Sequence, residues 1–242
     1  MGFYPSEIPS MLPALLRGLE ITVVATFLVM AIALVAGLPV ALARMSNVWL
    51  LRLPATIYVQ VLRGTPVLLQ LFYLYYVLPF AGIRLSAWTA GITGMSAAYA
   101  AYLSEIYRAG IEAVDRGQTE AALSIGMSRL QVMRLVVLPQ AVRIVIPPIG
   151  NIFIGLFKDT SLLSILTIRE LMFEGQILAA TNFRHITIFT VVVVLYLAVC
   201  WPSAAIIDRL ERDLKRLPHD HTQPAPRWRW FAFPFSYRRT RP

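Results

Sequence analysis

Charged side chains are rare in the apolar parts of this 242-residue chain, so the few present are the first candidates for specific chemistry. The clearest are Lys158 and Asp159, adjacent residues within an apolar run. Neighbours on a helix project about 100° apart, so these two charges do not simply pair with each other. Two interpretations stay open. One or both side chains face a central cavity and contact a zwitterionic ligand, or the helix ends near Phe157, with Lys158 reaching the interface and Asp159 capping the next turn.

A neighbouring apolar segment, Trp88 to Tyr107, is rich in small residues, which is typical of tight packing between helices. Within it, Ala98 and Tyr102 fall along one helical face. Glu105 and Arg108 stand three residues apart near its end. This spacing favours a local ion pair over a ligand site.

The stretch Arg63-Gly64-Thr65-Pro66 is predicted to mark the entry of another apolar helix. Proline fits the first turn of a helix, and threonine is a favourable cap. For Arg63, two roles stay open: binding anionic lipid headgroups, or contacting the loop formed by residues 110–143.

The elements that carry these residues are apolar helices long enough to cross a membrane. The chain is 57% hydrophobic and 14% charged, which is too apolar for an ordinary soluble domain. A hydrocarbon core of about 30 Å needs roughly 20 helical residues. Five segments meet this requirement, at about residues 19–43, 55–79, 88–107, 144–166 and 186–207. The predicted fold class is therefore an all-α membrane protein with five transmembrane helices.

The basic residues predict the orientation of these helices. With the N-terminus outside and the C-terminus in the cytoplasm, 17 Lys and Arg residues fall on the cytoplasmic side. Only Arg17, Arg84, Arg169 and Arg184 fall on the other side, and Lys158 is left inside the fourth helix. The net charge of +9 is then mostly a consequence of topology, which argues against nucleic acid as a partner.

The cytoplasmic loop between the third and fourth helices carries strong signals of its own structure. Gln118 to Ile125 favours a helix, and Gly126 offers the left-handed conformation that closes one. Ser128 is followed three residues later by Gln131, which is the spacing of a capping box. Pro139 cannot continue an unbroken helix and is predicted to end the second one.

Several stretches together resemble one family. They are "LLRGLEITVVAT", "VLRGTPVLLQLFYLYYVLP", "AYLSEIYRAGIEAVDRGQTEAALSIGMS", "LPQAVRIVIPPIGN" and "FKDTSLLSILTIREL". They are similar to the permease subunit of bacterial ATP-binding-cassette (ABC) importers of the polar amino-acid uptake family, which includes histidine, glutamine and glutamate permeases. The resemblance implies the type I ABC importer permease fold for residues 15–212. Residues 1–14 are then an external segment, and residues 213–242 a basic cytoplasmic tail that is predicted to be disordered.

The resemblance also implies the job of the loop, which in such importers docks on a separate ATPase subunit and couples transport to ATP. By position, the coupling residues are Glu120, Ala121, Ala122, Gly126, Ser128 and Pro139. The chain lacks a Gly-x-x-x-x-Gly-Lys-Ser/Thr sequence to hold phosphate, so it is not predicted to be an enzyme itself. ATP and Mg²⁺ would be used by the partner ATPase, and the chain itself would bind no cofactor or metal.

The implied mechanism is alternating access in the bacterial inner membrane. The candidates for the substrate path are Lys158, Asp159, Ala98, Tyr102 and Thr65. Many relatives place an asparagine near the position of Ala98, and its absence leaves the substrate open among glutamate, glutamine, cationic amino acids, cystine, opines and ectoine.

The implied partners are two ATPase subunits, a second permease that is identical or related, an external solute-binding protein and membrane lipid. The alternative is a secondary transporter or channel-type subunit that is not driven by ATP. That alternative predicts internal repeats and several charges at bilayer depth.

Overall fold

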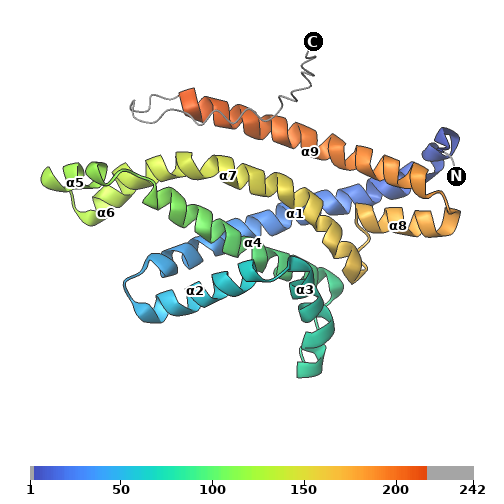
Figure 1. Ribbon diagram of the computed structural model, residues 1–242, viewed down its shortest axis with the longest axis horizontal. Coiled ribbons are helices and arrows are strands. Elements are labelled where there is room, and N and C mark those ends of the chain that lie inside the picture. Colours follow the sequence, from blue (N-terminus) through green and yellow to red (C-terminus); the bar gives the residue numbers. More distant parts are fainter. Residues whose placement is uncertain (1–2, 217–242) are drawn as a thin grey trace, which may run out of the picture.

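The computed structural model describes residues 3–216, and this part of the chain contains helices and no strands. Of the tail predicted to be disordered, residues 213–216 belong to the last helix, so the prediction is wrong there, and its remaining residues lie outside the described part of the chain. The long helices are α1 (Ile8–Met45), α4 (Ala87–Glu112), α7 (Leu138–Asp159) and α9 (His185–Arg216). Helix α1 packs against α4, and α7 packs against both α4 and α9 (Figure 1). These four helices form the body of the molecule.

The two ends of this body carry different structures. Helices α5 (Arg116–Ser124) and α6 (Arg129–Gln131) form a hairpin at one end (Figure 1, left). Helix α8 (Leu171–Asn182) lies beside the start of the chain at the opposite end. The hairpin is therefore separated from α8 by the full length of the bundle.

Three helices of the described chain are long and apolar enough to cross a membrane, and a bent pair of helices makes a fourth candidate. The three are Pro5–Met45, Arg129–Leu166 and His185–Leu214. Helix α4 covers the residues of the third predicted span but is not among these candidates, so five membrane-crossing helices are not confirmed. Its small residues pack tightly, as predicted. A Cβ atom added to Gly37 of α1 would lie only 3.0 Å from the carbonyl oxygen of Ala100 in α4.

The second predicted span is wrong as a single helix. Helix α2 (Trp49–Gly64) ends at the glycine, and α3 (Val67–Phe72) begins after the proline. A π-helical turn and a 3-10 turn extend α3 to Ala81, and the two halves are bent by 107°. Residues before a proline avoid the helical region, and Thr65 is extended (φ −119°, ψ 144°). Its hydroxyl donates back to the carbonyl oxygen of Val61 (2.8 Å) and does not cap α3.

The prediction that Pro139 ends a helix is also wrong. Helix α6 passes through a π-helical turn, Val132–Val137, directly into α7, so one helix runs from Arg129 to Leu166. Pro139 lies in the first turn of α7, immediately after the π-helical turn. A local change of hydrogen-bond register tolerates the missing N–H that would break a regular helix. The hairpin is therefore continuous with the helix that contains the fourth predicted span.

A buried carboxyl group joins three helices at the end opposite the hairpin. Glu170 is fully buried and caps α8, where its carboxylate accepts the backbone N–H groups of Met172 (2.9 Å) and Phe173 (2.8 Å). It also accepts the hydroxyl of Tyr196 in α9 (3.1 Å). Thr22 of α1 lies 3.4 Å from the same carboxylate and accepts the N–H of Leu171. This cluster fixes α8 against α1 and α9.

The stability of the protein should fall as pH rises through the titration of Glu170, which lies between the fourth and fifth predicted spans. Burial raises its pKa from 4.5 to about 7, although four hydrogen bonds to the carboxylate oppose the shift. Between these two values the folded state holds the proton more tightly than the unfolded state. The free energy of unfolding should therefore drop by on the order of 3 kcal/mol from about pH 4.5 to about pH 7.

Thermal unfolding of the detergent-solubilised protein across this pH range measures the effect. The Glu170→Gln variant is the control, because it keeps the size of the side chain but cannot titrate. Its unfolding temperature should change less with pH than that of the wild type. A wild-type stability that rises with pH, or an equal slope in both proteins, would contradict the prediction.

Candidate functional site

The turn between α5 and α6 has the geometry that the sequence predicts. Asp115 caps α5 by accepting the N–H of Gly117 (2.6 Å). Gly126 then adopts the left-handed conformation, with φ +88°. The hydroxyl of Ser128 accepts the N–H of Gln131 (3.4 Å), and the side chain of Gln131 accepts the N–H of Ser128 (2.8 Å). This reciprocal pair is a capping box, and it fixes the start of the second helix.

Of the predicted coupling residues, Ala122 points inward and the others lie on the surface. Ala122 is buried against Val132 and Val137, and its small side chain lets α5 approach the helix that follows. Glu120, Ala121, Gly126, Ser128 and Pro139 are exposed.

The hairpin presents an apolar tip, and two of its residues, Leu123 and Ile125, were not predicted. Ile125 is 79% exposed, and Leu123 and Leu130 beside the same turn are also exposed. An apolar residue immediately before the turn glycine is the signal that was available. Exposed apolar groups clustered at a well-ordered turn are typical of a protein interaction site.

A cavity of about 460 Å³ lies between α3, α4 and α7. Its lining residues are Val67, Tyr99, Tyr102, Ile106, Pro148, Asn151, Ile152, Gly155 and Asp159. Among the described residues of this lining, Asp159 alone carries a formal charge, and its carboxylate accepts the hydroxyl of Tyr99 at 2.5 Å. The cavity therefore offers one carboxylate, an amide and two phenols within apolar walls, which suits a small polar ligand.

The candidate residues for the substrate path do not all meet at this cavity. Asp159 and Tyr102 line it, while Ala98 is fully buried in α4 and does not. Helix α7 continues through Asp159, so it does not end at Phe157. Lys158 is exposed and does not line the cavity, and the described residues contain no ion pair between Lys158 and Asp159. Tyr99 and Asn151 line the cavity but were not predicted.

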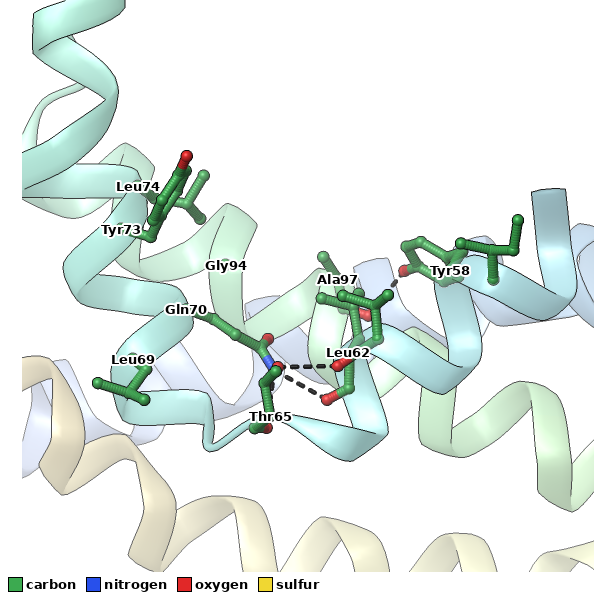
Figure 2. A pocket seen from close by; sticks show the side chains of 11 residues that line it. Tyr58, Leu62, Thr65, Leu69, Gln70, Tyr73, Leu74, Gly94 and Ala97 are labelled. Atoms are coloured by element: carbon green, nitrogen blue, oxygen red, sulfur yellow. Dashed lines mark hydrogen bonds between the residues drawn. The ribbon is translucent and has the colours of Figure 1, made fainter.

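Thr65 lines a separate groove of about 660 Å³, which Figure 2 shows at the bend between α2 and α3. The walls are almost entirely apolar. Gln70 holds the bend together, because its amide nitrogen donates to the carbonyl oxygens of Leu62 (2.8 Å) and Thr65 (3.1 Å) (Figure 2). These bonds satisfy carbonyl groups left open at the end of α2.

Three arginines surround one carboxylate near the hairpin end of the bundle. Glu105 pairs with Arg44 (2.6 Å), Arg63 (3.0 Å) and Arg108 (3.0 Å). The predicted pair between Glu105 and Arg108 is confirmed. Arg63 also lies over the ring of Tyr102, 5.6 Å from its centroid, so its observed contacts are to α4 and not to the hairpin.

The described chain combines helices long enough to cross a membrane, a helical hairpin with an apolar tip, and a small polar cavity between the helices. Together these features indicate a subunit of a membrane transport system. Residues 33–216 match the family described as the inner membrane component of binding-protein-dependent transport systems. The match covers most of the chain, and the protein belongs to this family.

Curated relatives agree with this family. The chain is 40% identical over 200 residues to a probable amino-acid ABC transporter permease, YckA, of Bacillus subtilis, covering 83% of this chain and 88% of the relative. It is 36% identical over 219 residues to the glutamine transport system permease GlnP of Escherichia coli, covering 90% of this chain and 100% of the relative.

Solved structures show the same fold. A chain from the crystal structure of an amino acid ABC transporter with histidines has a TM-score of 0.85 and 33% identity, covering 88% of this chain and 100% of that chain. A chain of the inward-facing MetNI methionine ABC transporter has a TM-score of 0.70 at 20% identity, with the same coverage, and supports the fold alone.

Proposed function

We propose that this protein is the permease subunit of an ATP-driven ABC importer that moves a polar amino acid, or a similar solute, into the cell by alternating access. The single observation that carries this proposal is the continuous helix from Arg129 to Leu166. One end of this helix forms half of the exposed hairpin, and the other end supplies Asn151 and Asp159 to the cavity. A force on the hairpin therefore acts on the same helix that lines the cavity.

The topology proposed with this function has five spans, with the N-terminus outside and the hairpin in the cytoplasm. The bend between α2 and α3 makes the second span a broken one, and α4 forms the third. The separation of the hairpin from α8 supports this arrangement (Figure 1). So does the excess of arginines near the hairpin end.

Within this topology, the cavity between α3, α4 and α7 is the candidate substrate path. The Asp159 carboxylate would accept hydrogen bonds from the ammonium group of an amino acid, and the side-chain amide of Asn151 would bond its carboxylate. Five spans are too few to enclose a path, so a second permease, identical or related, would complete it. Two ATPase subunits would dock on the hairpins and use ATP and Mg²⁺, and an external binding protein would deliver the solute.

Reconstitution of the complete complex in proteoliposomes tests this function. Uptake of radiolabelled amino acids should require ATP on the side of the membrane where the ATPase subunits lie. It should also require the loaded binding protein on the opposite side. An ATPase subunit that binds but cannot hydrolyse ATP should abolish this uptake. Uptake that persists with the inactive ATPase would overturn the proposal and favour a secondary transporter or a channel.

The Ile125→Asp variant should lose most of its affinity for the ATPase subunit. Burying an unpaired charge at an interface in place of an apolar anchor costs a few kcal/mol, which corresponds to more than about tenfold in affinity. Co-purification of the ATPase with the tagged permease measures the effect.

Phe183→Asp is the matched control for this measurement. Phe183 is 77% exposed at the other end of the bundle, and its left-handed backbone (φ 54°) tolerates aspartate. This variant should bind the ATPase normally. Equal recovery of the ATPase with Ile125→Asp and the wild type would show that the apolar tip does not dock.

A further inference from the structure

We propose that the ion pair between Arg63 and Glu105 is a releasable latch, which holds the bend of α2 and α3 against α4 and so sets the width of the cavity. The inference rests on the proposed function, since it assigns a conformational role to residues beside the candidate substrate path. It concerns a contact between helices and does not place Arg63 or Glu105 in contact with substrate.

Two ion pairs of Glu105, with Arg44 and with Arg63, differ in their exposure to solvent. Arg44 and Glu105 are 14% and 19% exposed and lie 2.6 Å apart. Removing one partner from a pair with so little solvent contact is costly, so this ion pair ties Glu105 to α1. Arg63 is 43% exposed, and pairs with that much solvent contact add little stability. The contact made by Arg63 can therefore break and re-form at low cost.

The charges around Glu105 also favour release of Arg63. The cluster holds three guanidinium groups, from Arg44, Arg63 and Arg108, and two carboxylates, from Glu105 and Glu112. When Arg63 leaves, Glu105 keeps its contacts with Arg44 and Arg108. No carboxylate is then left unpaired, and the departing guanidinium group is already half in solvent. Release thus carries no penalty for an uncompensated buried charge.

The bend between α2 and α3, which carries Arg63, can move as a single rigid corner. Gln70 bonds to Leu62 and Thr65 across the bend, which keeps the angle between the two helices fixed (Figure 2). Gly64 has open space where a side chain would be, so nothing packs against the corner at that point. A displacement of the corner therefore pivots α2 and α3 together.

Such a displacement changes the cavity directly. Val67, the first residue of α3, lines the cavity, and so does Tyr102, whose ring lies under the guanidinium group of Arg63. Moving Arg63 away from Glu105 moves Val67 relative to Tyr102. The closed latch keeps these two walls together, and release separates them.

The hairpin is connected to the latch by the end of α4. Arg108 bridges Glu105 and Glu112, and Glu112 is the last residue of α4. Asp115 caps α5 three residues further along the chain. Movement of the hairpin on its ATPase partner would therefore act on the carboxylate of Glu105, which pairs with Arg63.

The Arg63→Gln variant tests the latch in the reconstituted complex. Losing the latch should favour the open arrangement before substrate arrives, so the basal rate of ATP hydrolysis should rise about 2- to 5-fold, as expected for an exposed ion pair. The stimulation by loaded binding protein should fall by a similar factor. Arg63→Lys, which keeps the charge, should restore most of the stimulation.

Arg52→Gln is the matched control, because Arg52 is an exposed arginine of the same helix with no ion pair among the described residues. It should leave both rates unchanged. Glu105→Gln should raise the basal rate as Arg63→Gln does. If this variant fails to assemble because the ion pair with Arg44 is lost, Arg63→Gln alone decides.

Two results would overturn the latch. One is unchanged basal and stimulated rates in Arg63→Gln, and the other is a parallel loss of both rates in an assembled complex. Each outcome needs a wild-type complex that is stimulated by loaded binding protein. A wild-type complex without such stimulation would instead overturn the proposed function.

Discussion

Replacing Gly126 with valine should abolish ATP-driven uptake, while the protein still inserts and its bundle still folds. Gly126 has φ +88°, a conformation that a β-branched residue adopts only with strain. No atom lies within 4 Å of the position where its side chain would begin, so the effect comes from the backbone and not from a clash. A strain of about 1–2 kcal/mol or more would reshape the turn between α5 and α6. Uptake and ATP hydrolysis in proteoliposomes measure the loss.

A matched pair of variants separates coupling from general strain. Gly82 has almost the same conformation, φ +85°, and the same open surroundings, but it precedes α4 and is far along the chain from the hairpin. Gly82→Val should therefore keep coupled hydrolysis. Gly126→Asn should also keep most of the uptake, because asparagine tolerates left-handed conformations. Normal uptake in Gly126→Val would show that the turn geometry has no part in coupling.

Local signals were enough to predict the hairpin. Gly126, Ser128 and Gln131 act through backbone conformation and short-range hydrogen bonds, which depend on residue type and spacing alone. Pro139 failed as a stop signal because a π-helical turn precedes it. A change in hydrogen-bond register of that kind leaves no clear pattern in the sequence.

The second span failed for a related reason. The segment of high hydropathy continues through Thr65 and Pro66. A hydropathy criterion therefore predicts one helix where the chain makes a 107° bend. The proline was read as the start of a helix, which is correct for α3. The sequence did not predict that another helix, α2, ends just before this proline. It also did not predict that the side chain of Gln70 hydrogen-bonds across the bend to the end of α2.

The candidate site shows the limit of reasoning from single residues. Lys158 and Asp159 stand out because charges are costly in apolar segments. Their separation onto different sides of α7 follows from helical geometry, but which one meets the cavity depends on packing with α4. Tyr99 and Asn151 have no such signal. Ala98 shares a helical face with Tyr102, yet it is fully buried and lies outside the cavity lining.

The Asp159→Asn variant should reduce amino-acid uptake about 10- to 100-fold, chiefly through a higher KM. Asparagine keeps the shape of the side chain and can still accept the hydroxyl of Tyr99, now held at 2.5 Å. It removes the one formal charge that the described residues contribute to the cavity lining. A hydrogen bond to a charged group contributes about 1.5–3 kcal/mol, and this is the interaction that an ammonium group of the substrate would lose. Initial uptake rates across substrate concentrations measure the effect.

Lys158→Gln is the control, because it removes the adjacent charge on a side of α7 that does not line the cavity. It should leave the KM nearly unchanged if Asp159 alone contacts the solute. Tyr99→Phe tests positioning: it removes the hydroxyl that orients the carboxylate, so it should raise the KM less than Asp159→Asn does. An unchanged KM in Asp159→Asn, or a larger rise in Lys158→Gln, would contradict a contact between Asp159 and the substrate.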